Sequence, residues 1–61
     1  MSLHNIEFEY MVDGEDHEGF LPNVEIDEEL DLDAQEMSCV FEIKNLFPDA
    51  TDIRITNMEP V

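Results

Sequence analysis

Apolar and polar residues alternate in three stretches of the chain and follow a helical spacing in a fourth. Residues 6–12, I-E-F-E-Y-M-V, repeat with a period of two, which is typical of a half-buried strand. The alternation returns at residues 20–26 and again at 53–58. Residues 33–47, D-A-Q-E-M-S-C-V-F-E-I-K-N-L-F, place apolar side chains three or four positions apart and therefore predict a helix.

The period of two assigns each strand residue to a face of the sheet. The residues expected on the inner face are Ile6, Phe8, Tyr10, Val12, Phe20, Pro22, Val24, Ile26, Ile53 and Ile55. Met58 is expected on the outer face with Arg54 and Thr56. Because Pro22 has no N–H to donate to a neighbour, the second strand should lie at an edge of the sheet.

The helical stretch has one broad apolar face and a second, smaller apolar patch. The broad face, which should contact the sheet, consists of Cys39, Val40, Ile43, Leu46 and Phe47. Met37 and Phe41 lie one turn apart outside that face. Two interpretations of this pair remain open: it packs against a loop or the rim of the core, or it forms a helix-to-helix homodimer contact. Cys39 is expected to be a buried, inert thiol.

The connections between these elements complete a fold prediction. Asp13-Gly14 signals a turn, and the polar residues through Gly19 are interpreted as a long acidic hairpin loop. Asp33, followed by Glu36, has the spacing of a helix cap, with Asp31 as the competing cap, and Pro48 ends the helix.

The element order is strand, strand, helix, strand. It predicts a small α+β domain whose three-stranded sheet has the order 2-1-3, antiparallel in one part and parallel in the other, with the helix on one face. Residues 1–61 form one domain, and residues 1–4 and 59–61 are expected to be flexible.

Charge narrows the possible partners. The chain has 61 residues, of which 17 are acidic and two are Lys or Arg, so its formal net charge is −15. Such a charge disfavours direct binding to nucleic acid or to an anionic membrane and favours basic partners. The single cysteine excludes an internal disulfide. Because no apolar run is long enough to span a membrane and no signal peptide is evident, we expect a cytoplasmic protein.

Catalytic and metal-binding patterns are weak in this sequence. Neither His4 nor His17 is placed near Cys39, and so short a chain has little room for a cleft that would tune paired carboxylates. We therefore expect no enzymatic activity, no cofactor and no dedicated metal site. The segment 13–19, with its four carboxylates, leaves open a weak divalent-ion site, although it lacks the spacing of an EF-hand.

The uneven distribution of acidic residues is the strongest functional signal. Thirteen of the 17 acids lie between Glu7 and Glu36, a span without Lys or Arg. A dense carboxylate surface can occupy the basic groove of a nucleic-acid-binding protein. The residues predicted to form this partner-binding surface are Glu7, Glu9, Asp13, Glu15, Asp16, Glu18, Glu25, Asp27, Glu28, Glu29 and Asp31.

The size, the acidity and the inferred order of elements together resemble those of small phage-encoded inhibitors. Such proteins block host polymerases, DNA-repair glycosylases or CRISPR nucleases, some of them by imitating DNA. The resemblance implies a non-enzymatic binding protein that engages and inhibits a basic, nucleic-acid-binding partner. The alternative is a self-assembling module that dimerises through Met37 and Phe41 and whose acidity serves solubility only.

Overall fold

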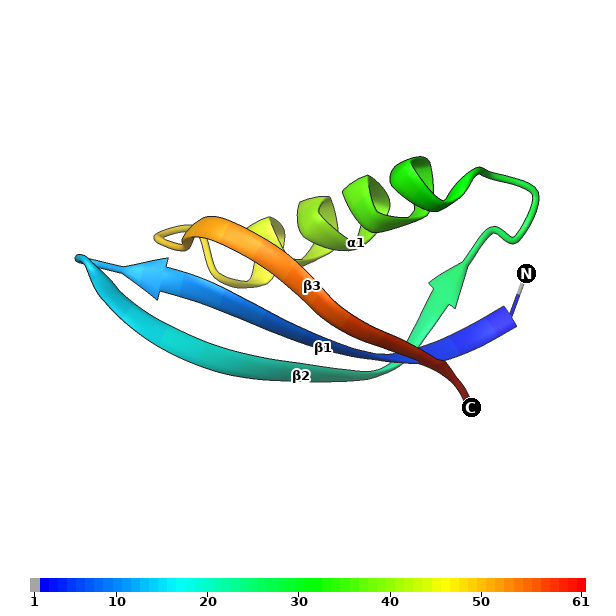
Figure 1. Ribbon diagram of the computed structural model, residues 1–61, viewed down its shortest axis with the longest axis horizontal. Helices are drawn as coiled ribbons and strands as arrows, with labels where there is room; N and C mark the ends of the chain where they lie inside the picture. The colour runs from blue at the N-terminus through cyan, green and yellow to red at the C-terminus, as the bar shows by residue number, and fades with distance from the viewer. Residues whose placement is uncertain (1) are drawn as a thin grey trace.

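A three-stranded antiparallel sheet with one helix across one of its faces forms this protein (Figure 1). The computed structural model describes residues 2–61. Its elements are β1 (Ser2–Val12), β2 (Glu15–Ile26), α1 (Leu32–Leu46) and β3 (Thr51–Pro60), and the strand order is β2-β1-β3. The small α+β fold and the 2-1-3 order predicted from the sequence are confirmed.

Both neighbouring strand pairs are antiparallel, so the predicted parallel part of the ladder is wrong. β2 and β3 run in the same direction, but β1 separates them. Residues 2–4 and 59–60, predicted to be flexible, belong to β1 and β3, and the Val61 N–H donates to the Leu3 carbonyl at 3.0 Å. Met1, the remaining residue of the predicted flexible N-terminal segment, lies outside the described residues.

The hairpin between β1 and β2 has a two-residue turn instead of the predicted loop. Asp13 and Gly14 both have positive φ angles, 52° and 79°, as a type I′ turn requires. That turn matches the twist of the flanking strands, so pairing continues directly from Val12 to Glu15. As a result, residues 15–19 belong to a strand. The ring of His17 in this strand stacks on the ring of Tyr10 in β1, with 5.3 Å between ring centroids.

A bulge in β2 overturns the predicted inward orientation of Phe20 and Pro22. His4 pairs with Val24 but Ile6 pairs with Leu21, so two β2 residues, Pro22 and Asn23, lie opposite one β1 residue. Asn23 accommodates the bulge with a φ of 55°. The extra residue reverses the alternation on its two sides. Leu21 therefore packs against the core, while Phe20 is 55% exposed and Pro22 is exposed.

An irregularity in β3 similarly overturns the prediction for Met58. Glu7 pairs with Asn57 and Phe8 pairs with Ile55, which leaves Thr56 as an extra residue in β3. The alternation shifts at this point, and Met58, predicted to face outward, packs against the core. Ile53 and Ile55 contact the same core, as predicted.

The core lies between α1 and β1. Its buried cluster is Ile6, Phe8, Ile26, Cys39 and Ile43. Burial, followed by the charges of Glu42 and Glu36, raises the pKa of the Cys39 thiol above its ordinary value of 9.0. Cys39 is thus buried as predicted.

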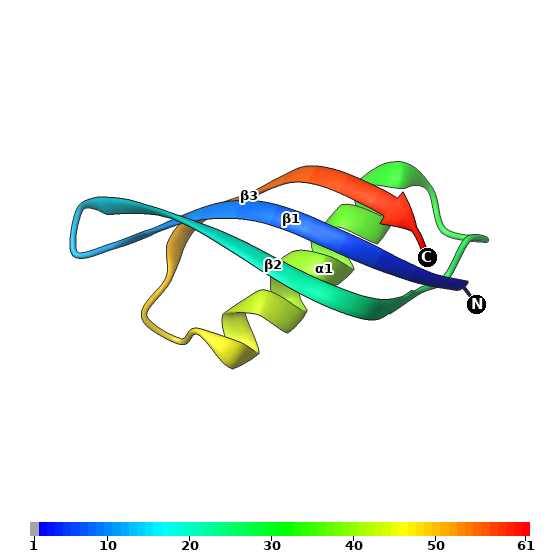
Figure 2. The same cartoon turned by 90° about the horizontal axis from the view of Figure 1, so that it is seen from below.

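At the C-terminal end of the helix, Leu46 departs from the predicted core face, whereas Phe47 contacts Tyr10 and Phe8. Leu46 is 55% exposed and Phe47 is 38% exposed, because only the middle of the helix lies over the sheet centre (Figure 2). Phe47 ends the helix as its C-cap and stacks on Tyr10 with 5.4 Å between ring centroids. The N-cap is Asp31, whose side chain accepts from the Ala34 N–H at 2.8 Å, whereas Asp33 lies within the first turn.

Candidate functional site

The acids predicted to form one surface occupy two separate regions. One group lies on β1 and β2, and it extends to the hairpin turn at one end of the long axis. The other group lies in the connection between β2 and α1 at the opposite end (Figures 1 and 2). The molecule measures 35 Å along this axis. The eleven predicted residues are therefore spread along this axis and do not form one compact cluster.

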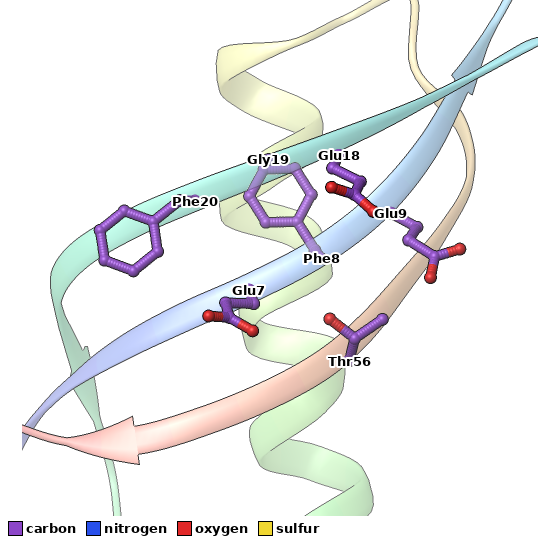
Figure 3. A pocket seen from close by; sticks show the side chains of 7 residues that line it. All are labelled: Glu7, Phe8, Glu9, Glu18, Gly19, Phe20 and Thr56. Atoms are coloured by element: carbon purple, nitrogen blue, oxygen red, sulfur yellow. The ribbon is translucent and has the colours of Figure 1, made fainter.

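The first group is centred on the sheet face that lies away from α1. We call this surface the acidic sheet face and define it as Glu7, Glu9, Asp16 and Glu18. Glu9 lies directly opposite Glu18, and Met11 lies opposite Asp16. Figure 3 shows Glu7, Glu9 and Glu18 on the sheet, with α1 behind it. Side chains directly opposite each other have Cβ atoms about 5 Å apart, so these carboxylates form a concentrated negative surface.

A shallow depression of about 390 Å³ marks the middle of the acidic sheet face. Glu7, Glu9 and Glu18 line it together with Phe20 and Thr56, as Figure 3 shows. The floor includes Gly19 and Phe8, which pair across the strands. The surface therefore combines three carboxylates with one half-exposed aromatic ring.

One cation balances part of this charge. Arg54 Nη2 on β3 donates to Glu9 Oε2 at 3.2 Å, and Arg54 pairs with Glu9 in the ladder. Both side chains are exposed to solvent, at 70% and 43%, so the pair contributes little to stability. Glu7, Asp16 and Glu18 make no salt bridge within residues 2–61. The local field around them is therefore negative.

Three acids of the β2–α1 connection, Asp27, Glu28 and Asp31, have hydrogen-bond partners within the fold. Asp27 Oδ1 accepts from the Glu29 N–H at 3.0 Å, the Ser2 hydroxyl donates to Glu28, and Asp31 caps the helix. These contacts give three of the local carboxylates a role in the fold. Glu29 is exposed with no side-chain contact to the described part of the chain.

The remaining predicted acids lie at the margins of these two groups. Asp13 forms the hairpin turn, and Glu15 pairs with Val12 directly after it. Glu25 pairs with Leu3 near the other end of the sheet. None of the three lines the depression of the acidic sheet face.

Met37 and Phe41 are 73% and 70% exposed. Met37 lines the depression between α1 and β3, and Phe41 does not. A position at the core rim agrees with the structure for Met37, which lies beside Ile53 and Ile55, and stays a prediction for Phe41. Their role as a contact with a second chain stays a prediction.

Sequence reasoning missed Phe20 as a surface residue, whereas Thr56 lies on the outer face as predicted. It placed Phe20 in the core because the alternation ran unbroken through Pro22, yet a proline followed by asparagine within a strand is itself a sign of a bulge. Nothing in the sequence around Thr56 indicates the second irregularity. The misplacement of Phe20 and that of Met58 have the same cause, since one extra residue exchanges the two faces of a strand.

Every buried side chain among residues 2–61 is apolar or is the thiol of Cys39, and no group of three or more His, Cys, Asp or Glu in this range could hold a metal ion. Within the same range, no helix is long and apolar enough to cross a membrane. Comparisons with protein families, with curated proteins and with solved structures found no match.

Proposed function

We propose that this protein is a non-enzymatic binding protein whose acidic sheet face engages, and inhibits, a basic nucleic-acid-binding partner. The observation that carries the proposal is the placement of Glu9 directly opposite Glu18. Like charges opposite each other destabilise a sheet, so a surface that serves folding alone would not favour them. A complementary basic partner turns the same repulsion into binding energy and rapid association.

The shape of this surface supports the same function. Glu7 and Glu9 lie on one face of one strand, about 7 Å apart, and Glu18 adds a carboxylate on the neighbouring strand. The exposed ring of Phe20 beside them offers an apolar contact, and aromatic residues dominate the energy of many interfaces. A groove lined with Lys and Arg, built to hold phosphates, accepts such a rigid row of carboxylates.

The test is competition with DNA, using variants that remove equal charge at different places. Glu7→Gln combined with Glu18→Gln neutralises the acidic sheet face. Glu29→Gln combined with Glu42→Gln makes the same chemical change on exposed residues outside it. Displacement of a fluorescent DNA duplex from a panel of polymerases, repair glycosylases and nucleases is followed by anisotropy at two salt concentrations.

We expect the native protein to displace DNA from at least one enzyme of the panel, and added salt to weaken this displacement. Displacement should be at least tenfold weaker for the sheet-face variant and nearly unchanged for the control variant. Removing the Glu9–Glu18 repulsion should also stabilise the fold by about 0.2–1 kcal/mol. Equal loss in both variants would show that total charge, and not this face, governs binding. Failure to displace DNA from any enzyme of the panel would refute inhibition by competition.

A self-assembling module is the second candidate function, and the exposure of Met37 and Phe41 favours it. Two such helices packed against each other would bury four large apolar side chains. Light scattering across a range of concentrations tests this candidate. A dimer that Met37→Lys and Phe41→Lys each disrupt supports it, and a monomer that persists at high concentration removes it.

A further inference from the structure

The outer edges of β2 and β3 are both irregular, and they differ in the residues that lie beside them. Within the part of the chain that the structure describes, β3 pairs with β1 on one side and with no strand on the other. The β2 edge is interrupted by the Pro22–Asn23 bulge, and its N-terminal half is strongly acidic. Bulges, proline and charge are the devices by which edge strands avoid further pairing. β3 also has irregularities, at Thr56 and within residues 52–53, but no proline interrupts its Ile-Arg-Ile segment and an apolar depression lies beside it.

Two depressions lie along this edge, and Ile53 and Arg54 line both of them. The first, about 580 Å³, lies between α1 and β3, and its apolar lining is Met37, Val40, Ile53 and Ile55. Asp33 and Glu36 contribute carboxylates to it. The second, about 390 Å³, is lined by Met11, Asp52, Ile53 and Arg54. Because side chains alternate along β1, Met11 shares the outer face of the sheet with Glu7 and Glu9.

We propose that the β3 edge pairs with an extended segment of a partner protein in which apolar and basic residues alternate. A strand added beside β3 directs successive side chains to opposite faces of the sheet. One set enters the apolar depression under α1, and the other set reaches the outer face near Asp52 and Glu9. The added strand also uses the backbone groups of β3 that face away from β1.

Charge complementarity selects this occupant. The protein has a net charge of −15. Arg54 lines both depressions but is paired with Glu9. The carboxylates of Asp33 and Glu36 at one depression and of Asp52 at the other therefore leave each negative and attract basic residues of the added strand. A second copy of the chain would bring an equal negative charge to the same edge and is disfavoured by repulsion. The β3 edge lies beside the acidic sheet face but needs neither Glu7 nor Glu18, so this proposal does not depend on the proposed function.

The probe is a short, N-acetylated peptide in which lysine and valine alternate. A second peptide of the same composition, with its lysines and valines in separate blocks, has the same charge and controls for nonspecific attraction. Binding is followed by amide chemical shifts and by hydrogen exchange of the full-length, isotope-labelled protein. Strand addition should slow the exchange of β3 amides at residues 53–56 by at least tenfold, and only with the alternating peptide.

Two variants with equal chemistry locate the binding site. Met37→Lys places a positive charge in the depression under α1, whereas Phe41→Lys makes a comparable change on the same helix outside that depression. Both residues are exposed, so both variants should keep the fold, which circular dichroism checks. We expect Met37→Lys to weaken peptide binding at least fivefold and Phe41→Lys to leave it within twofold.

Each alternative result overturns the proposal. Equal binding of the two peptides would show nonspecific attraction, and protection of β2 amides would place the added strand at the other edge. Equal effects of both lysine variants would indicate a site on the outer side of the helix. Slower exchange of β3 amides with increasing protein concentration and no peptide would identify a second copy as the occupant. Binding weaker than about 1 mM would also refute it.

Discussion

Gly19→Ala should destabilise the protein because the space beside Gly19 is filled by a buried ring. A Cβ atom at this position would lie within 3.0 Å of three ring carbons of Phe8. Phe8 is 1% exposed and packs against Tyr10 and Phe47, with centroids 5.6 Å and 6.3 Å away. The ring therefore cannot retreat without moving its neighbours. Overpacking of this kind costs about 1–3 kcal/mol.

A difference in backbone entropy offsets part of this expected loss of stability. Alanine loses less backbone entropy on folding than glycine, which favours the variant by about 0.5–1 kcal/mol. The net loss should therefore be about 2 kcal/mol, given the upper part of the overpacking range. A domain of this length has a free energy of unfolding of about 3–9 kcal/mol, so the variant should still fold. With a urea dependence of about 1 kcal/mol per M, the unfolding midpoint falls by about 2 M.

Equilibrium unfolding in urea, monitored by far-UV circular dichroism, measures this loss, and Phe8→Leu tests its cause. The smaller side chain leaves room for the new methyl group. The double variant should then be more stable than the sum of the single changes predicts, by at least about 1 kcal/mol. Additive effects, or an unchanged midpoint for Gly19→Ala, would show that the ring does not restrict this position.

Two further predictions concern the helix. Asp31→Ala should lower the free energy of unfolding by about 1 kcal/mol because it removes the N-cap acceptor, whereas Asp33→Ala should cost less than half as much; comparable losses in urea unfolding would contradict the assignment of the cap. Because the pKa of the Cys39 thiol is raised in the folded protein, the protonated thiol favours folding. This contribution to the free energy of unfolding is complete below pH 9.0 and is lost as the pH rises through the raised pKa. Stability above pH 9.0 should therefore fall more steeply in the native chain than in Cys39→Ala, by up to about 1.4 kcal/mol per pH unit, and parallel curves would disprove the linkage.

The sequence predicts the faces of a strand correctly only where pairing has no irregularity. β1 has no extra residue, and Ile6 and Phe8 are buried as its alternation predicts. In β2 and β3 the bulges exchange the faces, so Phe20 and Met58 were misplaced. Bulges form where two strands meet, and the pairing register that creates them is a tertiary property. A local pattern therefore cannot reveal them without a specific residue such as Pro22.

The candidate site was predictable in composition but not in arrangement. Acidic side chains are visible in the sequence, yet the opposition of Glu9 and Glu18 depends on the length of the turn between their strands. Asp13-Gly14 allows pairing to begin at the next residue, which converts an expected loop into part of the sheet face. The structural roles of Asp27 and Asp31 likewise follow from local backbone geometry.

The central position of β1 has a consequence for the order in which contacts form. Its ladder with β2 closes through a two-residue turn, while its ladder with β3 joins residues near opposite ends of the sequence, such as His4 and Pro60. Hairpins form in about 1–10 µs, whereas non-local pairing must first overcome a large loop-closure entropy. We expect Gly14→Ala mainly to slow folding and Ile55→Ala mainly to accelerate unfolding, as measured by stopped-flow kinetics. The opposite pattern would mean that the two ends of the chain meet before the hairpin closes.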